Sequence, residues 1–299
     1  MRFVVTGGAG FVGNNIVRLL LSRGYSVSVI DNLHTGRKEN LTDISHKIQF
    51  YEKDIRNIDE IEPILKDSDG IFHQAALTIV QESFFKEKEY FDVNVKGTEN
   101  IFQIGLKYNK KIVFASSSSV YGNSKKIPIT EDSEKKPINP YGITKLEDEF
   151  LAENYSKKGL EVIGLRYFNI FGKGQTGSYA GVITQFLRKL KDNQPPIIFG
   201  DGTQVRDFIH VTDIAEANLS AMLSDINTGF YNVGTGKATT IMYLAKTLIE
   251  VFGKEFNPEF RDALKGDVKI SQADTKLIKA KLNWKSKIGL KEGLENFMS

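Results

Sequence analysis

The sequence predicts an α/β fold, a doubly wound parallel sheet followed by a smaller α/β portion. Short β-rich runs alternate with longer segments of helical spacing over residues 1–167. Several of these runs are continuously apolar, as strands covered by helices on both faces are. After residue 168 the alternation loosens, and Gly, Pro and Asn become frequent. We therefore expect a first domain over 1–167, joined by part of 205–235, and a smaller substrate-binding domain over 168–299.

The expected elements follow from their start and stop signals. The run at 2–6 ends at glycines, and the helical segment after it stops at Gly24. Asn139 and Pro140 signal the start of a later helix. Further strands are expected at residues 25–31, 47–54, 69–75, 110–117 and 161–167. Further helices are expected at residues 57–66, 90–108, 140–158, 180–192, 212–224 and 240–252.

The composition limits the classes of protein and of site. The 299 residues include 40 basic and 37 acidic ones, a balance that argues against a nucleic-acid partner. There is no cysteine, which excludes disulfides and thiolate chemistry, and the four histidines lack ligand-like spacing, so no metal site is expected. No apolar run approaches the roughly 20 residues that span a membrane, and the N-terminus does not resemble a signal peptide. We expect a soluble, cytoplasmic protein without a membrane partner.

A glycine-rich turn lies between the first strand and the first helix. The stretch TGGAGFVG places Gly7, Gly10 and Gly13 in this turn. Glycine allows a tight turn and lets the backbone approach a pyrophosphate at the helix N-terminus. The alternative is a purely structural turn with a capping aspartate, but the strand–turn–helix context favours dinucleotide binding.

Carboxylates follow the second and third strands. Asp31 lies 18 residues after Gly13 and would accept hydrogen bonds from ribose hydroxyls while repelling a 2′-phosphate, which favours NAD over NADP. Asp54 and Ile55 come directly after the third strand, where they would flank the adenine.

Tyr141 and Lys145 lie four residues apart near the start of an expected helix, so they share one face. A phenol is a poor base at neutral pH, but an adjacent ammonium favours the phenolate. The lysine would also hold the nicotinamide ribose. An exposed helix pair is the alternative, yet the preceding dinucleotide fold favours a catalytic pair.

Four serines, Ser116 to Ser119, end the strand expected at 110–117. The carboxyl edge of a doubly wound sheet is where ligands bind. A hydroxyl at this edge would hydrogen-bond the substrate oxygen and complete a Ser/Tyr/Lys site.

Ten ordered stretches together resemble an extended short-chain dehydrogenase/reductase of the nucleotide-sugar (UDP-glucose or UDP-N-acetylglucosamine) 4-epimerase type. They are GGAGFVG (7–13), DNL (31–33), HQAAL (73–77), NVKGT (94–98), SSSSVYG (116–122), PYGITK (140–145), LRYFNIFG (165–172), DGTQVRDFIHVTDIA (201–215), YNVGTG (231–236) and GDVKISQAD (266–274). The resemblance covers nearly the whole chain. It implies an NAD-dependent isomerase that oxidises a UDP-sugar transiently at C4′ and returns the hydride to the other face of the sugar.

The resemblance assigns residues to three roles. The catalytic residues it implies are Ser117, Tyr141 as the base, and Lys145. The cofactor-binding residues it implies are Gly7, Gly10, Phe11, Val12, Gly13, Asp31, Asn32, Leu33, Asp54, Ile55, Gln74, Ala75, Ala76, Asn94, Ser116, Tyr141, Lys145 and Tyr167. The substrate-binding residues it implies are Ser117, Ser118, Tyr141, Asn169, Val182, Phe199, Arg206 and Ser271, with Phe208 as a second wall of the nucleobase pocket.

The reaction and the sugar depend on a few of these positions. Related dehydratases carry Asp-Glu after the catalytic serine and related decarboxylases carry a Glu, whereas here Ser118 and Ser119 follow it. Epimerisation is therefore favoured over dehydration or decarboxylation on the same fold. The small Ser271 admits an N-acetyl group, so UDP-Glc/UDP-Gal and UDP-GlcNAc/UDP-GalNAc both fit, and UDP-glucuronate stays open. The complete Ser/Tyr/Lys set argues against a non-catalytic NAD-binding sensor.

Two positions depart from the family pattern. An Arg-x-Gly-Asp stretch, whose arginine binds the diphosphate, is replaced by residues 264–267, Leu-Lys-Gly-Asp. Arg261 or Lys265 would have to take over this contact. Thr78 stands where many epimerases have a lysine that contacts the cofactor. As in the family, the helices expected at 90–108 and 140–158 would pair two chains in a homodimer.

Overall fold

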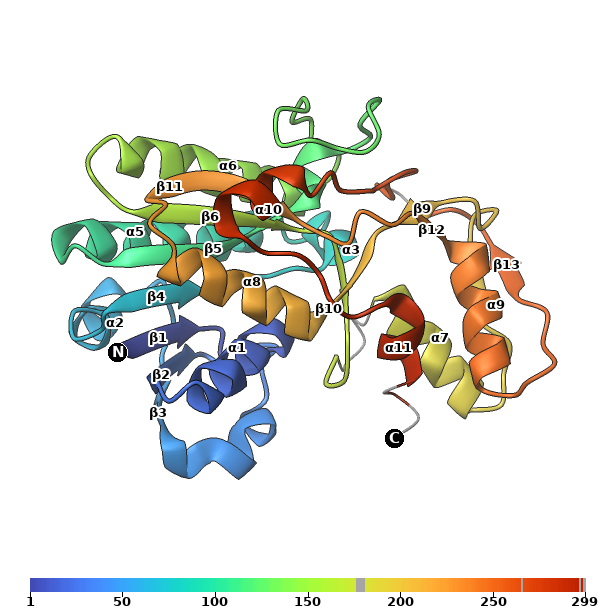
Figure 1. Cartoon of the computed structure of the whole chain (residues 1–299), viewed down its shortest axis with the longest axis horizontal. Helices are drawn as coiled ribbons and strands as arrows, with labels where there is room; N and C mark the ends of the chain where they lie inside the picture. The colour runs from blue at the N-terminus through green and yellow to red at the C-terminus, as the bar shows by residue number, and fades with distance from the viewer. Residues whose placement is uncertain (176–180, 265, 296, 298–299) are drawn as a thin grey trace.

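The computed structural model describes residues 1–175, 181–264, 266–295 and 297, and its centre is a sheet of seven parallel strands (Figure 1). The strand order is β11-β6-β5-β4-β1-β2-β3. The strands are β1 (Arg2–Thr6), β2 (Ser26–Asp31), β3 (Ile48–Glu52), β4 (Gly70–His73), β5 (Lys111–Ser117), β6 (Val162–Tyr167) and β11 (Thr228–Val233). The predicted doubly wound parallel sheet is confirmed.

The strand order reverses between β1 and β4. The chain runs outward from β1 through β2 to β3, then crosses back to β4 and continues to β5 and β6. In this central register Val5 of β1 lies between Val29 of β2 and Phe72 of β4. All residues of β4 and β6 are buried, which explains why these runs are apolar apart from His73 and Arg166. In sheets of this kind the reversal leaves a crevice at the carboxyl ends of the strands.

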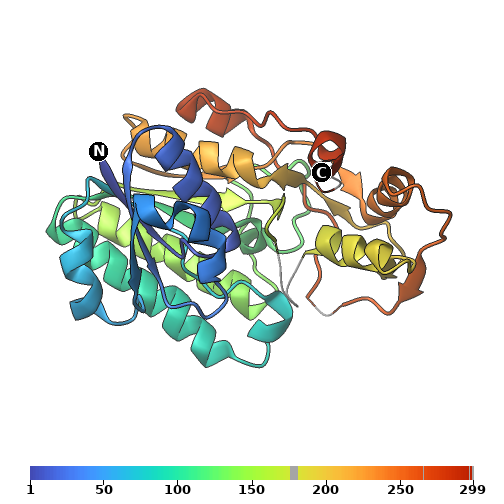
Figure 2. The ribbon, with the colours of Figure 1, turned by 90° about the horizontal axis from the view of Figure 1, so that it is seen from below.

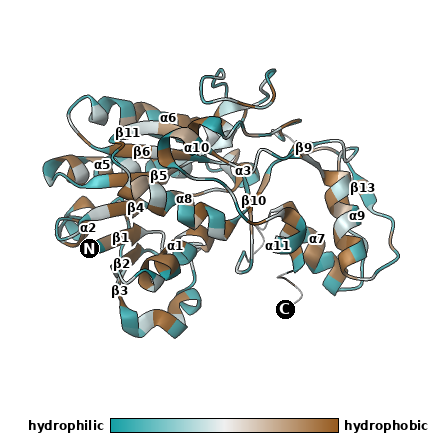
Figure 3. Cartoon of the chain, viewed as in Figure 1, coloured by the Kyte–Doolittle hydropathy of each residue, from teal (hydrophilic) through white to brown (hydrophobic). Residues whose placement is uncertain are grey.

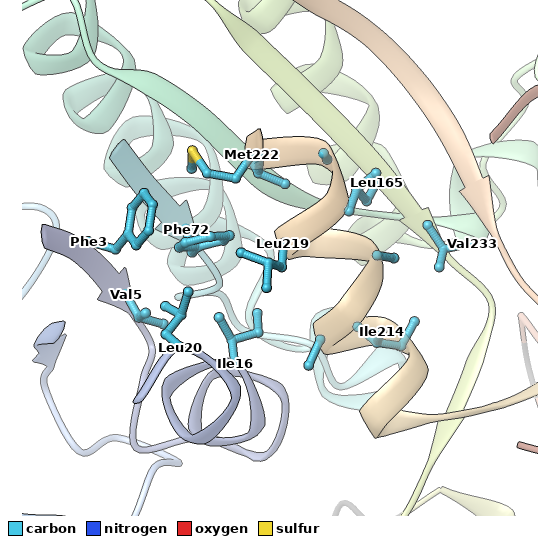
Figure 4. Packing of buried hydrophobic residues seen from close by; sticks show 14 of the residues in the cluster. Phe3, Val5, Ile16, Leu20, Phe72, Leu165, Ile214, Leu219, Met222 and Val233 are labelled. Carbon is cyan, nitrogen blue, oxygen red and sulfur yellow. The ribbon is translucent and has the colours of Figure 1, made fainter. Parts of the chain in front are cut away.

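One face of the sheet is covered by α1 (Phe11–Ser22) and α8 (Val211–Leu223). Figure 4 shows Ile16 and Leu20 of α1 and Leu219 of α8 meeting the side chain of Phe72 from the sheet. All of these side chains are buried in one cluster. The apolar residues of α1, which recur at helical spacing in the sequence, are therefore the ones that contact the sheet.

The opposite face is covered by α2 (Ile58–Leu65), α5 (Gly97–Lys107) and α6 (Pro140–Ser156), as the turned view in Figure 2 shows. Phe102 of α5 packs edge-to-face on Phe114 of β5, with ring centroids 5.4 Å apart. Helices on both faces bury the central strands, whereas the edge strand β3 keeps exposed residues, and polar loops gather at the carboxyl edge.

The helix expected at 90–108 differs in detail from the observed one. It begins as α4 (Glu87–Tyr90), continues through the wider π-helical turn η2 (Phe91–Lys96), and becomes α5. Such wider turns change the direction of the side chains that they carry. Here the turn contains Asn94, a fully buried polar residue, which apolar periodicity cannot reveal.

The remainder of the chain forms a smaller portion beside the carboxyl edge. Three two-stranded sheets pair β7 with β10, β9 with β12, and β8 with β13. The strands are β7 (Asn169–Phe171), β8 (Ile197–Phe199), β9 (Val205–Arg206), β10 (Phe208–His210), β12 (Thr239–Thr240) and β13 (Glu259–Arg261). Its helices are α7 (Val182–Lys191), α9 (Ile241–Val251) and α11 (Leu290–Glu295), whereas α10 (Lys276–Leu282) packs on the main sheet beside α8 and β11. In Figure 3, α7 and α9 carry both hydrophobic and hydrophilic residues, and their buried side chains share one core.

β11 pairs with β6 as the outermost strand of the main sheet, although it follows much of the smaller portion in sequence. The domain boundary after residue 167 stays a prediction. Shorter elements complete the described chain: η1 (Lys38–Lys47), α3 (Val80–Ser83) and η3 (Ser118–Tyr121). None of the helices in the described ranges combines the length and the apolar character needed to cross a membrane.

Candidate active site

A cavity of about 1170 Å³ lies at the carboxyl edge of the sheet and is closed on one side by the smaller portion. Its walls are the loops after β1, β2, β4 and β5, the start of α6, and residues of the 264–271 segment. Most of the predicted site residues line it: Gly7, Gly10, Phe11, Val12, Gly13, Asp31, Asn32, Leu33, Asp54, Ile55, Gln74, Ala75, Ala76, Ser116, Ser117, Ser118, Tyr141, Lys145, Tyr167, Asn169, Arg206 and Ser271.

The glycine-rich turn leaves no room for side chains. Gly7 has a φ of 68°, and a Cβ on it would lie 2.7 Å from the backbone nitrogen of Ala75. A Cβ on Gly13 would lie 2.1 Å from the carbonyl oxygen of Gly7. Gly10 caps α1, whose first turn contains no acidic residue. The helix N-terminus therefore opens onto the cavity with its N–H groups available, and this cradle fits a pyrophosphate.

Asp31 lies at the end of β2 and is 6% exposed. Its Oδ2 accepts a hydrogen bond from the Ala9 N–H at 2.9 Å, and its Oδ1 accepts one from the Leu33 N–H at 2.8 Å. Burial raises the pKa of Asp31, and these two backbone donors counteract that effect. A carboxylate has further lone pairs, so Asp31 can still accept hydrogen bonds from ribose hydroxyls.

Asp54 lies beside Asp31 across the same end of the cavity. It accepts a hydrogen bond from the Asn32 side chain at 2.8 Å and forms an ion pair with Arg56 at 2.7 Å. The Arg56 guanidinium lowers the pKa of Asp54 to about 2. The residues around the dinucleotide end are therefore held by one another, and they fit the adenosine half of NAD.

Tyr167 and Gln74 form the inner wall of the cavity. The Tyr167 hydroxyl lies 3.1 Å from Oε1 of Gln74 and 2.8 Å from Nδ2 of Asn218. Asn218 is a fully buried residue of α8, and its Oδ1 also accepts from Gln74 at 3.2 Å. Burial raises the pKa of Tyr167, so the phenol stays protonated. Asn218 thus determines how both wall residues face the cavity.

The first turn of α6 places Tyr141 and Lys145. The Asn139 side chain accepts a hydrogen bond from the Gly142 N–H at 2.8 Å, and Pro140 begins the helix. Both Tyr141 and Lys145 line the cavity. The Lys145 ammonium, which is 3% exposed, donates to Oδ2 of Asp148 at 3.0 Å.

All four serines of the run line the cavity. The Ser116 hydroxyl donates to Oε1 of Glu149 at 2.6 Å. Ser117 caps the short helix η3 by accepting from the Ser119 N–H at 3.1 Å, and it lines the cavity. Ser117 ends β5, and because its three neighbouring serines line the same cavity, its role at the substrate oxygen stays a prediction.

Glu149 is held by a buried bidentate ion pair with Arg166 of β6. The Arg166 Nε lies 2.8 Å from Oε1, and its Nη2 lies 2.8 Å from Oε2. Both side chains are 1% exposed. The Arg166 Nη1 also donates to the Tyr121 hydroxyl at 2.6 Å. This pair ties α6 to the ends of β5 and β6, so Tyr141 and Ser117 belong to one rigid unit.

The substrate end of the cavity contains Arg206 of β9, Asn169 of β7 and Ser271. The Arg206 guanidinium contacts the carboxylate of Asp267. The neighbouring Asp207 is fully buried and accepts hydrogen bonds from the backbone N–H groups of Thr235, Gly236 and Ala273. Asp207 therefore holds the loops that present Arg206 and Ser271.

The structure locates the departures from the family pattern. Leu264 lines the cavity, and so does Thr78. Arg261 is an exposed residue of β13, and it is not among the described residues that line the cavity. Lys265 lies outside the described residues. Arg206 is thus the arginine that the described structure brings to the substrate end.

Four predicted site residues lie elsewhere in the described structure. Asn94 is fully buried, and its amide pairs with the backbone of Leu77 and the Thr144 hydroxyl instead of lining the cavity. Val182, Phe199 and Phe208 belong to the smaller portion, where Val182 and Phe208 pack in its core. Asn94 supports the wall and α6 from behind, while a role for the other three in substrate binding stays a prediction.

Sequence reasoning missed Asn218, Asp148, Glu149 and Arg166. None of them lines the cavity, yet each bonds to a residue that does or supports its helix. The only available signal was a set of polar residues at positions where α6, β6 and α8 should be apolar.

Comparisons with known proteins agree with this geometry. Residues 3–234 match the family described as "NAD dependent epimerase/dehydratase family". A curated relative named "Putative UDP-glucose 4-epimerase", from Methanocaldococcus jannaschii, is 40% identical over 301 residues, which cover 99% of this chain and 97% of the relative.

Two solved structures share the fold over nearly their whole length. A UDP-glucose 4-epimerase from Thermotoga maritima with UDP-glucose has a TM-score of 0.94 and 36% identity, covering 99% of this chain and 97% of that one. A UDP-N-acetylglucosamine 4-epimerase from Methanobrevibacter ruminantium, in complex with UDP-N-acetylmuramic acid, has a TM-score of 0.94 and 36% identity, covering 99% and 96%. The resemblance noted in the sequence is confirmed, and the chain belongs to the NAD-dependent epimerase/dehydratase family.

Proposed function

We propose that the protein is an NAD-dependent UDP-hexose 4-epimerase, an isomerase with Tyr141 as its base. The observation that carries the proposal is the position of Tyr141, Lys145 and Ser117 around one cavity, whose other end has a glycine cradle and Asp31. The curated relative and the two solved structures described above carry names of UDP-sugar 4-epimerases, the relative's as a putative one.

The residues of the cavity divide the work of binding. The N–H groups at the start of α1 would hold the pyrophosphate of NAD, and Asp31 would accept the adenosine ribose hydroxyls. Lys145 would hold the nicotinamide ribose, and Tyr167 with Gln74 would pack near the nicotinamide. Bound NAD supplies an acceptor for the hydride of the sugar and returns it.

Tyr141 and Ser117 handle the proton. As a phenolate, favoured by the nearby Lys145 ammonium, Tyr141 takes the proton from the sugar 4′-hydroxyl and later gives it back to the same oxygen. Ser117 donates a hydrogen bond to that oxygen while it is a carbonyl. Net epimerisation requires the keto sugar to turn over between the two transfers, so the sugar must be held mainly through its diphosphate.

The diphosphate and the sugar meet different residues. Arg206 would bind the diphosphate by a charge-assisted contact in place of its present partner Asp267, and Asn169 would lie beside it. Ser271 is small, 6% exposed, and lines the cavity, so space for an N-acetyl group is available. We propose that the enzyme accepts both UDP-Glc/UDP-Gal and UDP-GlcNAc/UDP-GalNAc.

Dehydration, decarboxylation and glucuronate epimerisation are the alternatives. The two residues after Ser117 are Ser118 and Ser119, and both line the cavity. Neither hydroxyl can act as an acid or base near neutral pH, so elimination and loss of CO2 lack their catalytic group. UDP-glucuronate epimerisation needs no such group and differs only in the sugar.

A substrate panel tests the proposal. The purified protein is incubated separately with UDP-Glc, UDP-GlcNAc and UDP-GlcA, and the products are identified by NMR. We expect the 4′-epimers of UDP-Glc and UDP-GlcNAc at equilibrium ratios. Products that lack water or CO2 would contradict epimerisation, and turnover of UDP-GlcA alone would make the protein a glucuronate epimerase.

We also propose a homodimer. Ile143 and Phe150 are 49% and 48% exposed and lie two helical turns apart on α6, while Phe91 of the adjacent η2 is 44% exposed. This apolar strip over packed helices is suited to a second copy of the chain. Sedimentation equilibrium should give twice the 33.6 kDa mass of the chain, and a monomer at micromolar concentration would contradict the pairing.

A further inference from the structure

Asp148 is a buried carboxylate behind the catalytic lysine. It lies one helical turn after Lys145 on α6 and is 0% exposed, and its Oδ2 accepts the 3.0 Å hydrogen bond from the Lys145 ammonium. Lys145 lines the cavity whereas Asp148 does not. The ammonium therefore lies between the cavity and the carboxylate. A lysine has three N–H donors, so one on Asp148 leaves two for ligands in the cavity.

Among the described residues, the cation that contacts Asp148 is the Lys145 ammonium. From α6 the neighbouring Glu149 faces it, but that carboxylate is paired with Arg166. From α5 the Thr98 hydroxyl faces it and also bonds Nε2 of His73, at 2.9 Å.

His73, from β4, is fully buried beside Lys145. Burial, together with the Lys145 charge, lowers the pKa of His73 to about 3, so this imidazole is neutral. The positive charge that balances Asp148 is therefore that of Lys145.

We propose that Asp148 is a positioning residue for Lys145: its carboxylate holds the ammonium at the cavity wall and offsets part of the positive charge that acts on the Tyr141 phenol. The proposal rests on the roles of Tyr141 and Lys145 in the proposed function. The hydrogen bond to Oδ2 fixes the direction of the ammonium, so with Asp148 behind it the ammonium is aimed into the cavity.

The ionisation of Asp148 supports this role. Burial raises the pKa of Asp148 to about 6, while the Lys145 ammonium acts in the opposite direction. The carboxylate is thus mostly ionised at pH 7, where the enzyme would work. Its negative charge lies behind the ammonium and opposes the phenolate form of Tyr141, which the Lys145 charge favours.

Asp148→Asn tests the proposal because an amide keeps the shape and can still accept from Lys145 but has no charge. The ionisation of Tyr141 is followed in the NAD-loaded protein by tyrosinate absorbance, with Tyr141→Phe as the blank. We expect the tyrosinate titration of Tyr141 to move to lower pH by about one pH unit in Asp148→Asn, the order of magnitude for removing one charge from a partly polar interior.

Glu147→Gln is the matched control. It removes the same charge from the same helix, but Glu147 is half-exposed and its field is screened by water. The titration of Tyr141 should be unchanged in this variant. Equal shifts in both variants would mean that the net charge of the helix matters and not the pair with Lys145, which overturns the proposal.

An unshifted titration in folded Asp148→Asn also overturns the proposal. If that variant does not fold, Asp148→Ser, a smaller neutral replacement, is titrated by the same criterion. In a Lys145→Met background, Asp148→Asn should no longer move the titration by the full unit, because the position of the ammonium is lost. The titration is carried out without a sugar. If the titration shifts as expected but no UDP-sugar in the panel is epimerised, the proposed function is rejected while the role of Asp148 is kept.

Discussion

Tyr141 lines the cavity one helical turn before Lys145. In the proposed mechanism its hydroxyl is the group that exchanges a proton with the sugar. Replacing it by Phe keeps the ring and removes the proton acceptor. We expect turnover of UDP-Glc to fall by about 10²- to 10⁴-fold, the usual contribution of a general base. Coupled assay of epimer formation measures this loss.

The amount of NAD that co-purifies with Tyr141→Phe should match the wild type. Tyr155→Phe is the control, because Tyr155 is a buried tyrosine of the same helix whose hydroxyl lies 3.4 Å from Glu99, away from the cavity. Activity that survives in Tyr141→Phe would remove the base from the mechanism.

Ser271 is the residue where the choice of sugar can be changed. A tyrosine there would fill the space next to the sugar while the backbone contact of Ser271 with Val205, 3.0 Å long, is kept. We expect Ser271→Tyr to lower kcat/KM for UDP-GlcNAc relative to UDP-Glc by roughly tenfold or more. Ser271→Ala keeps the size small and should retain the wild-type ratio. Equal losses for both sugars would show that this position is not the gate.

At the residue scale the sequence predicted the side chains that face the cavity far better than those behind it. Gly7, Gly13 and Asp31 can be recognised in the sequence because of their positions at or just after the ends of expected strands. Asn218 and Asp148 do not, because their partners come from elements far away in sequence or from a helix face that is visible only after packing. A buried polar residue is meaningful only once its hydrogen-bond partner is known.

The element that matters most for the site is α6, whose first turn positions Tyr141 and Lys145, the proposed catalytic pair. Asn139 caps this turn, so Asn139→Ala should cost about 1 kcal/mol of the free energy of unfolding, measured by urea denaturation. The frayed turn should also lower kcat more than it changes KM. Asn139→Asp keeps a capping oxygen and should recover most of both losses. A stable but inactive alanine variant would mean that the cap serves activity alone.

Periodicity predicted the strands and long helices because each is apolar on the faces that it buries. The observed α1, α8 and α9 begin and end within a few residues of the expected limits. It failed at η2, where a wider turn interrupts an otherwise continuous helix. It also did not reveal α10 and α11, whose short lengths contain too few turns for a period to emerge.

At the scale of the whole molecule, buried His73 makes stability depend on pH. Its pKa is about 3 in the folded chain and about 6.5 in the unfolded one. Between these values the unfolded state binds more protons, so stability falls as the pH falls, by up to about 1.4 kcal/mol per pH unit. Above about pH 6.5 His73 is neutral in both the folded and the unfolded state, so this loss of stability does not occur there.

Urea denaturation at several pH values checks this dependence. His73→Gln retains hydrogen-bonding atoms toward Thr6 and Thr98 but does not titrate, so its stability should fall less steeply between pH 7 and pH 5. Parallel curves for the two proteins would exclude His73 as the source. His46→Gln, at a residue of η1 outside the cavity lining, is the control and should follow the wild type.

Because β11 follows its partner strand β6 far along the sequence, the sheet is incomplete during much of the synthesis of the chain. The backbone groups on the outer side of Val162 in β6 stay unpaired until Thr228 of β11 has been synthesised, because these two residues are partners in the sheet. While a nascent chain grows, the sheet therefore has an open edge, and the surface that α8 later covers is bare. A ribosome that stalls after residue 167 would leave a fragment with an unpaired apolar strand, which is a substrate for chaperones or for aggregation.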